Sequence, residues 1–409
     1  MNSLSHPALD RRSDRAVVIT GLGAVTGLGP NAREFWRRLI AAESAVGPVA
    51  SFDATEWRTH LGCEIREALP ETGHPDRVYD LAVSACREAV EQAGGTLPAE
   101  RTAVVIGTLQ GGILTLEQAV AGEIRQGRPL DILATYPVFI LSSLSRYIAS
   151  LFGFRGPVAT PCPACASSGT AISRAGDLIR LGYADAVVTG GADAFSQDTF
   201  SGFNAMRSAA ATACRPFSPN REGLVIGEGS GILILEARET ALARGAKPLA
   251  VLAGTGLSDD AHHITAPDPE GKGAELAMRA ALADAGLPPE RIDYINTHGT
   301  GTPQNDRMET LAVKRVFGER ARRLPLSSIK AAVGHCMGAA GAVEAVASVL
   351  TLLQGMLPPT LNFTPGDPEC DLDYVPNQAR LLAVKTVLSN SFGFAGNNVS
   401  LIFGLEGGK

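Results

Sequence analysis

Hydrophobic residues follow two alternating patterns along the chain. Short apolar runs, such as Val17–Ile19 and Ala186–Val188, are typical of strands that are buried on both faces of a sheet. Longer segments with apolar residues three or four positions apart, such as 35–42 and 166–181, predict helices that pack against these strands. Strands alternating with helices indicate an α/β protein in which parallel sheets are covered on both faces.

Part of this pattern occurs twice. Residues 89–108 contain a helix end, an Ala-Gly stop, a Pro-x-Glu-Arg turn and a β-rich segment, and residues 281–297 repeat that order. We therefore expect two similar halves, 15–255 and 256–409, after a disordered tail at 1–14.

A reactive side chain precedes a helix in each half. Cys165 lies before the predicted helix 166–181, and His335 lies before a second predicted helix, 338–354. Because ligand sites in α/β proteins form at strand-to-helix turns, we expect one active site where these turns of the two halves face each other.

Composition narrows the class of protein. The 409 residues are 45% hydrophobic and the formal net charge is −6, which argues against a general nucleic-acid-binding surface. The seven cysteines are odd in number and scattered, so we expect reduced thiols and a cytoplasmic location. No unbroken apolar run approaches about 18 residues, so we expect no membrane span, and the polar N-terminal segment does not resemble a signal peptide.

Cys165 has the setting of a nucleophile. Its neighbours are small, and it comes between an extended segment and a helix, where free N–H groups stabilise a thiolate. A buried structural cysteine is the alternative for a lone Cys.

Cys162 and Cys165 together form a Cys-x-x-Cys pattern. No second ligand pair has the spacing of a zinc site, so we expect no metal. Reversible oxidation of the two thiols remains a hypothesis.

Two histidine motifs follow in the second half. His298 ends a buried strand within a Gly/Thr loop that also contains Thr300 and Thr302, which suits a linear polar ligand; a satisfied core histidine is the alternative. Asp306 and Glu309 are expected to cap a helix and form ion pairs.

The second motif contains Lys330, His335 and Glu344. At a helix start His335 is expected to stay neutral, so that its Nε2–H can donate to a carbonyl oxygen. Lys330 is expected in an apolar strand, as a buried charge paired with Glu344.

Residues 388–399 place Gly393, Phe394 and Ala395 in a loop before the last strand. The loop is either a simple glycine turn or a mobile segment in which Phe394 gates a pocket and a backbone N–H helps to bind an oxyanion.

Taken together, these motifs resemble the β-ketoacyl synthase family over essentially the whole chain. The resemblance implies the thiolase fold, with two pseudo-twofold halves in a duplicated five-layered α-β-α-β-α core, usually in a dimer. It implies that Cys165 accepts the acyl group, that His298 and His335 polarise the malonyl thioester carbonyl, and that Lys330 is the family's active-site lysine with Glu344 as its partner. It further implies that Phe394 gates the acyl pocket and that Thr300 and Thr302 contact the phosphopantetheine arm.

The implied reaction is a decarboxylative condensation of malonyl-acyl carrier protein (ACP) with a Cys-bound acyl chain, without a cofactor other than the arm of ACP. The implied partners are ACP and either a second copy or a ketosynthase-like chain-length subunit. The chain departs from the family pattern at Cys162-Pro163 and at Ala395, where glycine is usual, and the short segment 206–215 resembles polyene-forming polyketide ketosynthases rather than fatty-acid enzymes.

Two other functions stay open at this point. A non-catalytic pairing subunit would resemble the family but lack the nucleophile. A CoA-dependent thiolase-like enzyme would use a second cysteine near the C-terminus, and neither Cys336 nor Cys370 has an obviously equivalent context.

Overall fold

The computed structural model describes residues 15–406, so the expected tail at residues 1–14 lies outside the described part. Ten of the described strands form one sheet, in the order β10-β9-β13-β14-β8-β1-β7-β6-β4-β5. The first half of the chain contributes β1 Val17–Thr26, β4 Thr102–Gly107, β5 Val158–Ala159, β6 Ala186–Asp193 and β7 Gly229–Ala237. The second contributes β8 Ala250–Asp259, β9 Tyr294–Asn296, β10 Leu326–Ser327, β13 Thr386–Phe392 and β14 Asn397–Gly404.

Both halves of this sheet have the same topology. When the five strands of each half are numbered along the chain, both halves read 3-2-4-5-1 from the outer edge to the centre. In each half the fifth strand, β7 or β14, is antiparallel to both of its neighbours, and the outer three strands are parallel. The duplication predicted from the repeat is confirmed.

The expectation of wholly parallel sheets was wrong, because the sheet is mixed. The β-strands buried on both faces read as continuous apolar runs whatever the direction of their neighbours, so the sequence pattern could not distinguish the two arrangements.

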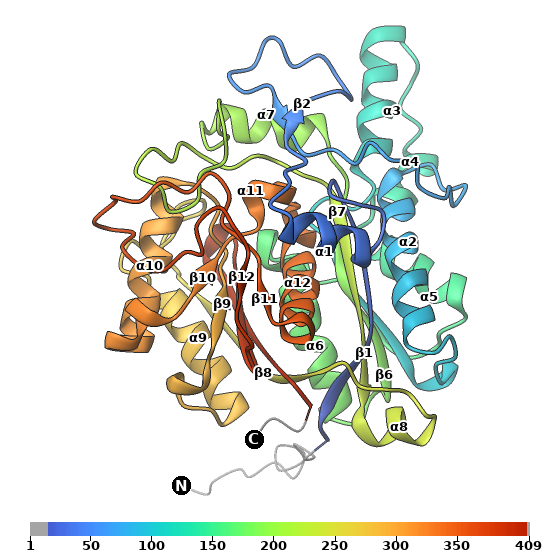
Figure 1. Cartoon of the computed structure of the whole chain (residues 1–409). Helices are drawn as coiled ribbons and strands as arrows, with labels where there is room; N and C mark the ends of the chain where they lie inside the picture. Colours follow the sequence, from blue (N-terminus) through green and yellow to red (C-terminus); the bar gives the residue numbers. More distant parts are fainter. Residues whose placement is uncertain (1–14, 407–409) are drawn as a thin grey trace, which may run out of the picture.

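Helices separate and cover the two half-sheets (Figure 1). α6 and α12 pack against each other in the centre, with α6 against β4 and β6 and α12 against β7 and β13. α2 and α5 lie on the outer face of the first half, and α9, with α10 against it, lies outside the second. This is the expected α-β-α-β-α arrangement; these six helices are α2 Arg77–Gln92, α5 Ser142–Phe152, α6 Ser167–Arg180, α9 Lys272–Ala285, α10 Pro303–Phe317 and α12 Ala340–Gln354.

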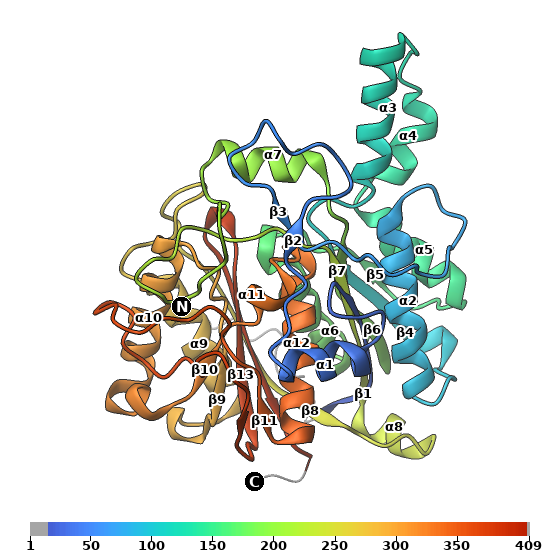
Figure 2. The same ribbon diagram turned by 45° about the horizontal axis from the view of Figure 1, so that its top comes forward.

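The remaining elements lie around this core. α3 and α4 form a pair that projects from the body of the molecule (Figure 2). The two small sheets pair β2 with β3 and β11 with β12. These elements are α1 Ala32–Ile40, β2 Gly47–Pro48, β3 Leu61–Gly62, α3 Ile113–Gln126, α4 Ile132–Phe139, α7 Gln197–Ala205, α8 Arg238–Ala243, α11 Lys330–Val333, β11 Met356–Leu357 and β12 Arg380–Leu381.

Glycines allow the central helices to approach the strands closely. A Cβ on Gly107 would lie 2.4 Å from the carbonyl carbon of Ser167 in α6, and one on Gly231 would lie 2.5 Å from that of Ala342 in α12. Both distances are shorter than any van der Waals contact. A side chain at Gly107 would therefore displace α6, and a side chain at Gly231 would displace α12.

One helical stretch, Met337–Gln354, is long and apolar enough to cross a membrane, but 83% of that window is buried in the fold. Two consecutive helices, Ile132–Phe139 and Ser142–Phe152, are together long and apolar enough to cross a membrane only if they are counted as one span, although they are bent by 78° where they meet. The first stretch has the burial of a core helix.

Candidate active site

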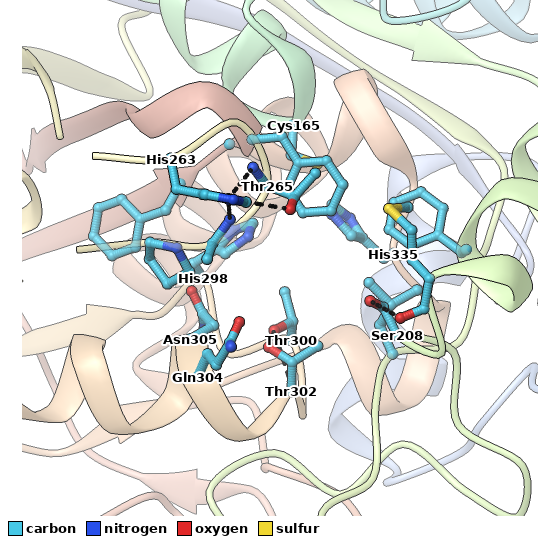
Figure 3. A pocket seen from close by; sticks show the side chains of 18 of the residues that line it. Cys165, Ser208, His263, Thr265, His298, Thr300, Thr302, Gln304, Asn305 and His335 are labelled. Carbon is cyan, nitrogen blue, oxygen red and sulfur yellow. Dashed lines mark hydrogen bonds between the residues drawn. The ribbon is translucent and has the colours of Figure 1, made fainter. Parts of the chain in front are cut away.

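The carboxyl ends of the outer, parallel strands converge on one cavity of about 420 Å³. Cys165 follows β5, His298 follows β9, and His335 follows β10 after the short helix α11. All three line the cavity together with Thr300 and Thr302, whose hydroxyl oxygens are 2.9 Å apart (Figure 3). The structure thus brings together residues from both halves, as the repeat predicted.

Cys165 lies in a 3₁₀ turn, Ala164–Ala166, immediately before α6, and only 5% of the residue is exposed. Burial raises the pKa of its thiol to about 12, although the positive charge of Lys330 acts in the opposite direction. The backbone at the helix start and the charge of Lys330 both lower this pKa, as expected of a site that stabilises a thiolate, but desolvation outweighs them.

His298 and His335 form an edge-to-face pair, with ring centroids 5.4 Å apart and an interplanar angle of 82°. Both are buried. Burial and the charge of Lys330 hold both pKa values well below 6.5, and His335 lowers that of His298 further. Both imidazoles are therefore neutral at physiological pH, as expected for His335.

Lys330 is the first residue of α11 and not part of a strand, contrary to the sequence prediction. Its ammonium group donates to the His298 carbonyl oxygen at 2.6 Å, faces His298 Nδ1 at 3.4 Å and forms an ion pair with Glu344. Because an ammonium group can only donate, His298 Nδ1 must be the accepting nitrogen, which leaves the ring proton on Nε2. Lys330 therefore sets the tautomer of His298.

The Lys330–Glu344 pair is almost completely buried, at 1% and 2% side-chain exposure, as the sequence predicted. Burial raises the pKa of Glu344 to about 7, and the charge of Lys330 opposes that shift. Removing either partner would leave a buried charge without its counter-ion, which is strongly destabilising.

Glu309 and Asp306 both hold the loop that carries His298. Glu309 accepts the backbone N–H groups of His298 at 2.9 Å and Gly299 at 2.8 Å, and Asp306 accepts that of Gly301 at 3.2 Å. Burial raises the pKa of Glu309 to about 7. The expectation that these two residues cap a helix and form ion pairs was wrong, since both carboxylates accept backbone N–H groups of loops.

The loop after β13 closes the cavity beside the nucleophile. A Cβ at Gly393 would lie 2.9 Å from the Pro163 carbonyl oxygen and 3.2 Å from the Cys165 nitrogen, so this position requires glycine. Phe394 lines the cavity and stacks on Phe203, with ring centroids 5.6 Å apart. Ala395 has a left-handed backbone, with φ 59° and ψ 19°, and its N–H donates to the Ile264 carbonyl oxygen at 2.8 Å.

Sequence analysis missed several residues of the site. Buried Asp193, at the end of β6, accepts N–H groups from Leu109, Gln110 and Gly338, which joins the turns around the cavity. Burial raises its pKa to about 6. An acidic residue at the end of a buried strand was the available signal. Phe203 and His263 also line the cavity, but they lie outside recognisable motifs.

Cys162 is exposed and Cys165 is buried, and both thiols are free. Within residues 15–406, no group of three or more His, Cys, Asp or Glu side chains is arranged to hold a metal ion. Oxidation of the Cys162–Cys165 pair stays a hypothesis.

Comparison with known proteins agrees with this geometry. The N-terminal domain of β-ketoacyl synthases matches residues 14–241, and the C-terminal domain matches residues 249–364. The 3-oxoacyl-[acyl-carrier-protein] synthase 2 of Synechocystis sp. is 40% identical over 95% of this chain and 98% of its own length. Nodulation protein E of Rhizobium sp. (strain N33) is 43% identical over 95% of this chain and 99% of its own length.

Solved structures have the same fold. The ishigamide ketosynthase/chain length factor has a TM-score of 0.91 and 36% identity, covering 96% of this chain and 100% of that one. A ketosynthase (ApeO) in complex with its chain length factor (ApeC) from Xenorhabdus doucetiae has a TM-score of 0.85 and 34% identity, over 98% and 99% of the two chains.

The thiolase fold and a cysteine with two neutral histidines in one cavity define an acyltransferase of the ketosynthase class. The chain belongs to the β-ketoacyl synthase family.

Proposed function

We propose that the protein condenses malonyl-ACP with an acyl chain carried on Cys165, to give a 3-oxoacyl-ACP that is two carbons longer. The observation that carries this proposal is the convergence of Cys165 and two neutral imidazoles, His298 and His335, on one cavity. In this assignment the first half, 15–255, supplies the nucleophile, and the second half, 256–409, supplies the histidines.

The first step is transfer of the acyl group. The Cys165 sulfur attacks the acyl thioester carbon, the bond to the carrier sulfur breaks, and the carrier thiol leaves with the proton of the cysteine. Thr300 and Thr302, on the wall of the cavity, would contact the phosphopantetheine arm. The backbone N–H groups of Cys165 and Phe394 would bind the tetrahedral oxyanion, with Gly393 allowing the close approach and Ala395 holding the loop.

The second step is decarboxylation and condensation. Malonyl-ACP loses CO₂, and the electron pair of that bond forms an enolate whose oxygen accepts Nε2–H groups from His298 and His335. The enolate carbon then attacks the Cys165 thioester, and the cysteine leaves as the 3-oxoacyl product forms. Lys330, Glu344, Glu309 and Asp306 position these groups, and no cofactor beyond the arm of ACP is needed.

The proposed partners are ACP and a second ketosynthase-like chain, either a copy or a chain-length subunit, in the cytoplasm. A solved relative is a ketosynthase in complex with its chain length factor, and another is an acyl-carrier protein in complex with its ketosynthase bound to the hexaketide. These relatives and the short segment 206–215 support polyketide or polyene assembly, and the similarity to 3-oxoacyl-[acyl-carrier-protein] synthase 2 supports fatty-acid biosynthesis, so the proposal includes both pathways.

The test is the intact mass of the protein after mixing with octanoyl-ACP, with Cys165→Ala as the control. A gain of one octanoyl group in the wild type alone, followed by chain extension on addition of malonyl-ACP, is expected. No gain with plausible partner subunits present would favour a pairing subunit, and acylation by octanoyl-CoA alone would favour a CoA-dependent enzyme.

A further inference from the structure

His263 lines the cavity on the segment that follows β8, and the residue is exposed to solvent (Figure 3). Its Nδ1 accepts the backbone N–H groups of Thr265 and Ala266, both at 3.1 Å. A ring nitrogen that accepts two N–H groups carries no proton of its own, so the proton of this imidazole lies on Nε2. The imidazole is therefore neutral, and it closes the turn 263–266 on its own backbone.

This turn supports the loop beside the nucleophile. The Ile264 carbonyl oxygen, inside the turn, accepts the N–H of Ala395 at 2.8 Å. A second contact lies where the segment begins, because the N–H of Asp260 donates to the Gly396 carbonyl oxygen at 2.9 Å. Ala395 has φ 59°, which is unfavourable for an L-residue, so its conformation depends on such contacts. The loop therefore depends on the turn that His263 closes.

The same loop reaches the nucleophile. Gly393 lies so close to Cys165 that a Cβ at this glycine would be 3.2 Å from the Cys165 nitrogen. In the proposed reaction the N–H groups of Cys165 and Phe394 bind one oxyanion, and such donors are effective because they are held in place before the reaction. A shift of about 1 Å in a positioned group costs about a hundredfold in rate. Contacts that fix the loop therefore fix one of the two donors.

Nδ1 of His263 accepts hydrogen bonds only while the ring is neutral. A protonated imidazole donates from both nitrogens, and histidine is the side chain whose charge changes between pH 5 and 8. Protonation would direct a donor at the N–H groups of Thr265 and Ala266 and open the turn. The other titratable groups of the cavity are Cys165, Asp260, His298 and His335, and His262 precedes His263 in the chain.

We propose that His263 is a positioning residue for the acylation of Cys165. As a neutral acceptor it closes the turn 263–266, and this turn holds the Phe394 N–H where the oxyanion of acyl transfer forms. The enolate of decarboxylation is held by the other two histidines of the cavity, so His263 supports acylation and not CO₂ release. This inference rests on the proposed function and names a residue that regulates its first step.

The test uses two substitutions that separate the acceptor from the rest of the ring. His263→Asn keeps an acceptor, because asparagine Oδ1 is bonded to Cγ as Nδ1 is, and His263→Leu has a similar shape without one. We expect His263→Leu to slow acylation of Cys165 by octanoyl-ACP about tenfold at pH 7.5, and His263→Asn to stay within about twofold of the wild type. His262→Leu, at the exposed neighbour, is the control.

Three further readouts distinguish positioning from a general structural role. CO₂ release from malonyl-ACP, measured on the same preparations, should keep the wild-type rate in both His263 variants. Between pH 7.5 and pH 5.5 the acylation rate of the wild type should fall about threefold relative to that of His263→Asn, because only the wild type loses its acceptor. The other titratable groups are the same in both proteins and cancel in this ratio. Exchange of the residue 395 amide should be about tenfold faster in His263→Leu than in His263→Asn.

Several results would overturn the inference while leaving the proposed function intact. Equal slowing of acylation in the two His263 variants would assign the effect to Nε2 or to the ring, and not to the acceptor. Equal slowing of acylation and CO₂ release, or acylation at the wild-type rate in His263→Leu, would also contradict it. Failure of the wild type to acylate Cys165 would overturn the proposed function as well.

Discussion

Lys330 links the electrostatics of the site to its geometry. One ammonium group satisfies the His298 carbonyl, fixes the accepting nitrogen of that ring and neutralises Glu344. Its charge also lowers the pKa values of both histidines and that of Cys165. In the proposed reaction, Lys330 would therefore act through the two histidines and Cys165 without touching a reacting atom.

Replacing Lys330 with Met should change the state of the histidines. Loss of the charge should raise the pKa values of His298 and His335, and loss of the donor should let the His298 proton occupy either nitrogen. Nitrogen-15 chemical shifts of the imidazoles, recorded between pH 5 and 8, measure both effects. Lys272→Met, at an exposed ion pair, is the control. Unchanged shifts in the Lys330 variant would contradict this role.

The candidate residues of the site could be proposed from the sequence at this scale, and so could the neutral state of His335, but the raised pKa of Cys165 could not. Cys165 and His298 are recognisable because each follows an extended segment and precedes small or glycine residues. The raised pKa of Cys165 follows from its burial in the folded protein, where residues as distant in the chain as Gly393 lie against it, and no local pattern contains such contacts.

At the scale of elements, the 3₁₀ turn Phe394–Gly396 beside the cavity has backbone strain. Ala395 has a left-handed backbone, which costs an L-residue about 1 kcal/mol more than glycine. The Ala395–Ile264 hydrogen bond and the Phe394–Phe203 stack hold the loop in place against that cost.

Ala395→Gly should stabilise the observed loop conformation, because glycine adopts positive φ without strain. We expect hydrogen exchange of the residue 395 amide to slow about fivefold. Ala41→Gly is the matched control, since Ala41 has φ −75° and gains no such relief. Faster exchange at residue 395 in the glycine variant would show that the strain does not limit loop opening.

Long elements were predictable from the pattern, and short ones were not. The predicted helices 166–181 and 338–354 agree with α6 and α12 within two residues at each end, because their caps and spacing are local. Lys330 was placed in a strand because four residues, Lys330–Val333, are too few for a helical period to appear.

At the scale of the whole molecule, two buried neutral histidines make stability depend on pH. Unfolding returns each pKa from well below 6.5 to about 6.5, so below that value the unfolded chain binds more protons. Stability from these groups is therefore lost as the pH falls below 6.5. Glu309 and Glu344 have pKa values near 7 in the folded protein, so between about pH 4 and pH 7 the folded protein binds more protons than the unfolded chain at these two groups. The stability that they contribute is therefore present at low pH and is lost as the pH rises to 7.

A difference between variants isolates one histidine from these opposing groups. The free energy of unfolding of the wild type minus that of His335→Asn should decrease between pH 7 and pH 5.5, by about 1 kcal/mol. Urea unfolding at both pH values measures it. A difference that stays constant with pH would mean that His335 is not held neutral in the folded protein.

The duplication explains why one site needs both halves. Equivalent turns after β5 and β10 place Cys165 and His335 at the starts of the paired central helices. The repeat was visible in the sequence, but the antiparallel return of β7 and β14 depends on pairing between segments far apart in the chain.

The central claim is that Cys165 accepts the acyl group and the two histidines drive decarboxylation. The most direct test measures both half-reactions in His298→Ala and His335→Ala: acylation of Cys165 by octanoyl-ACP, and CO₂ release from malonyl-ACP. We predict that acylation persists while CO₂ release falls by about 10²–10³. CO₂ release at the wild-type rate in both variants, or equal loss of the two half-reactions, would contradict the account.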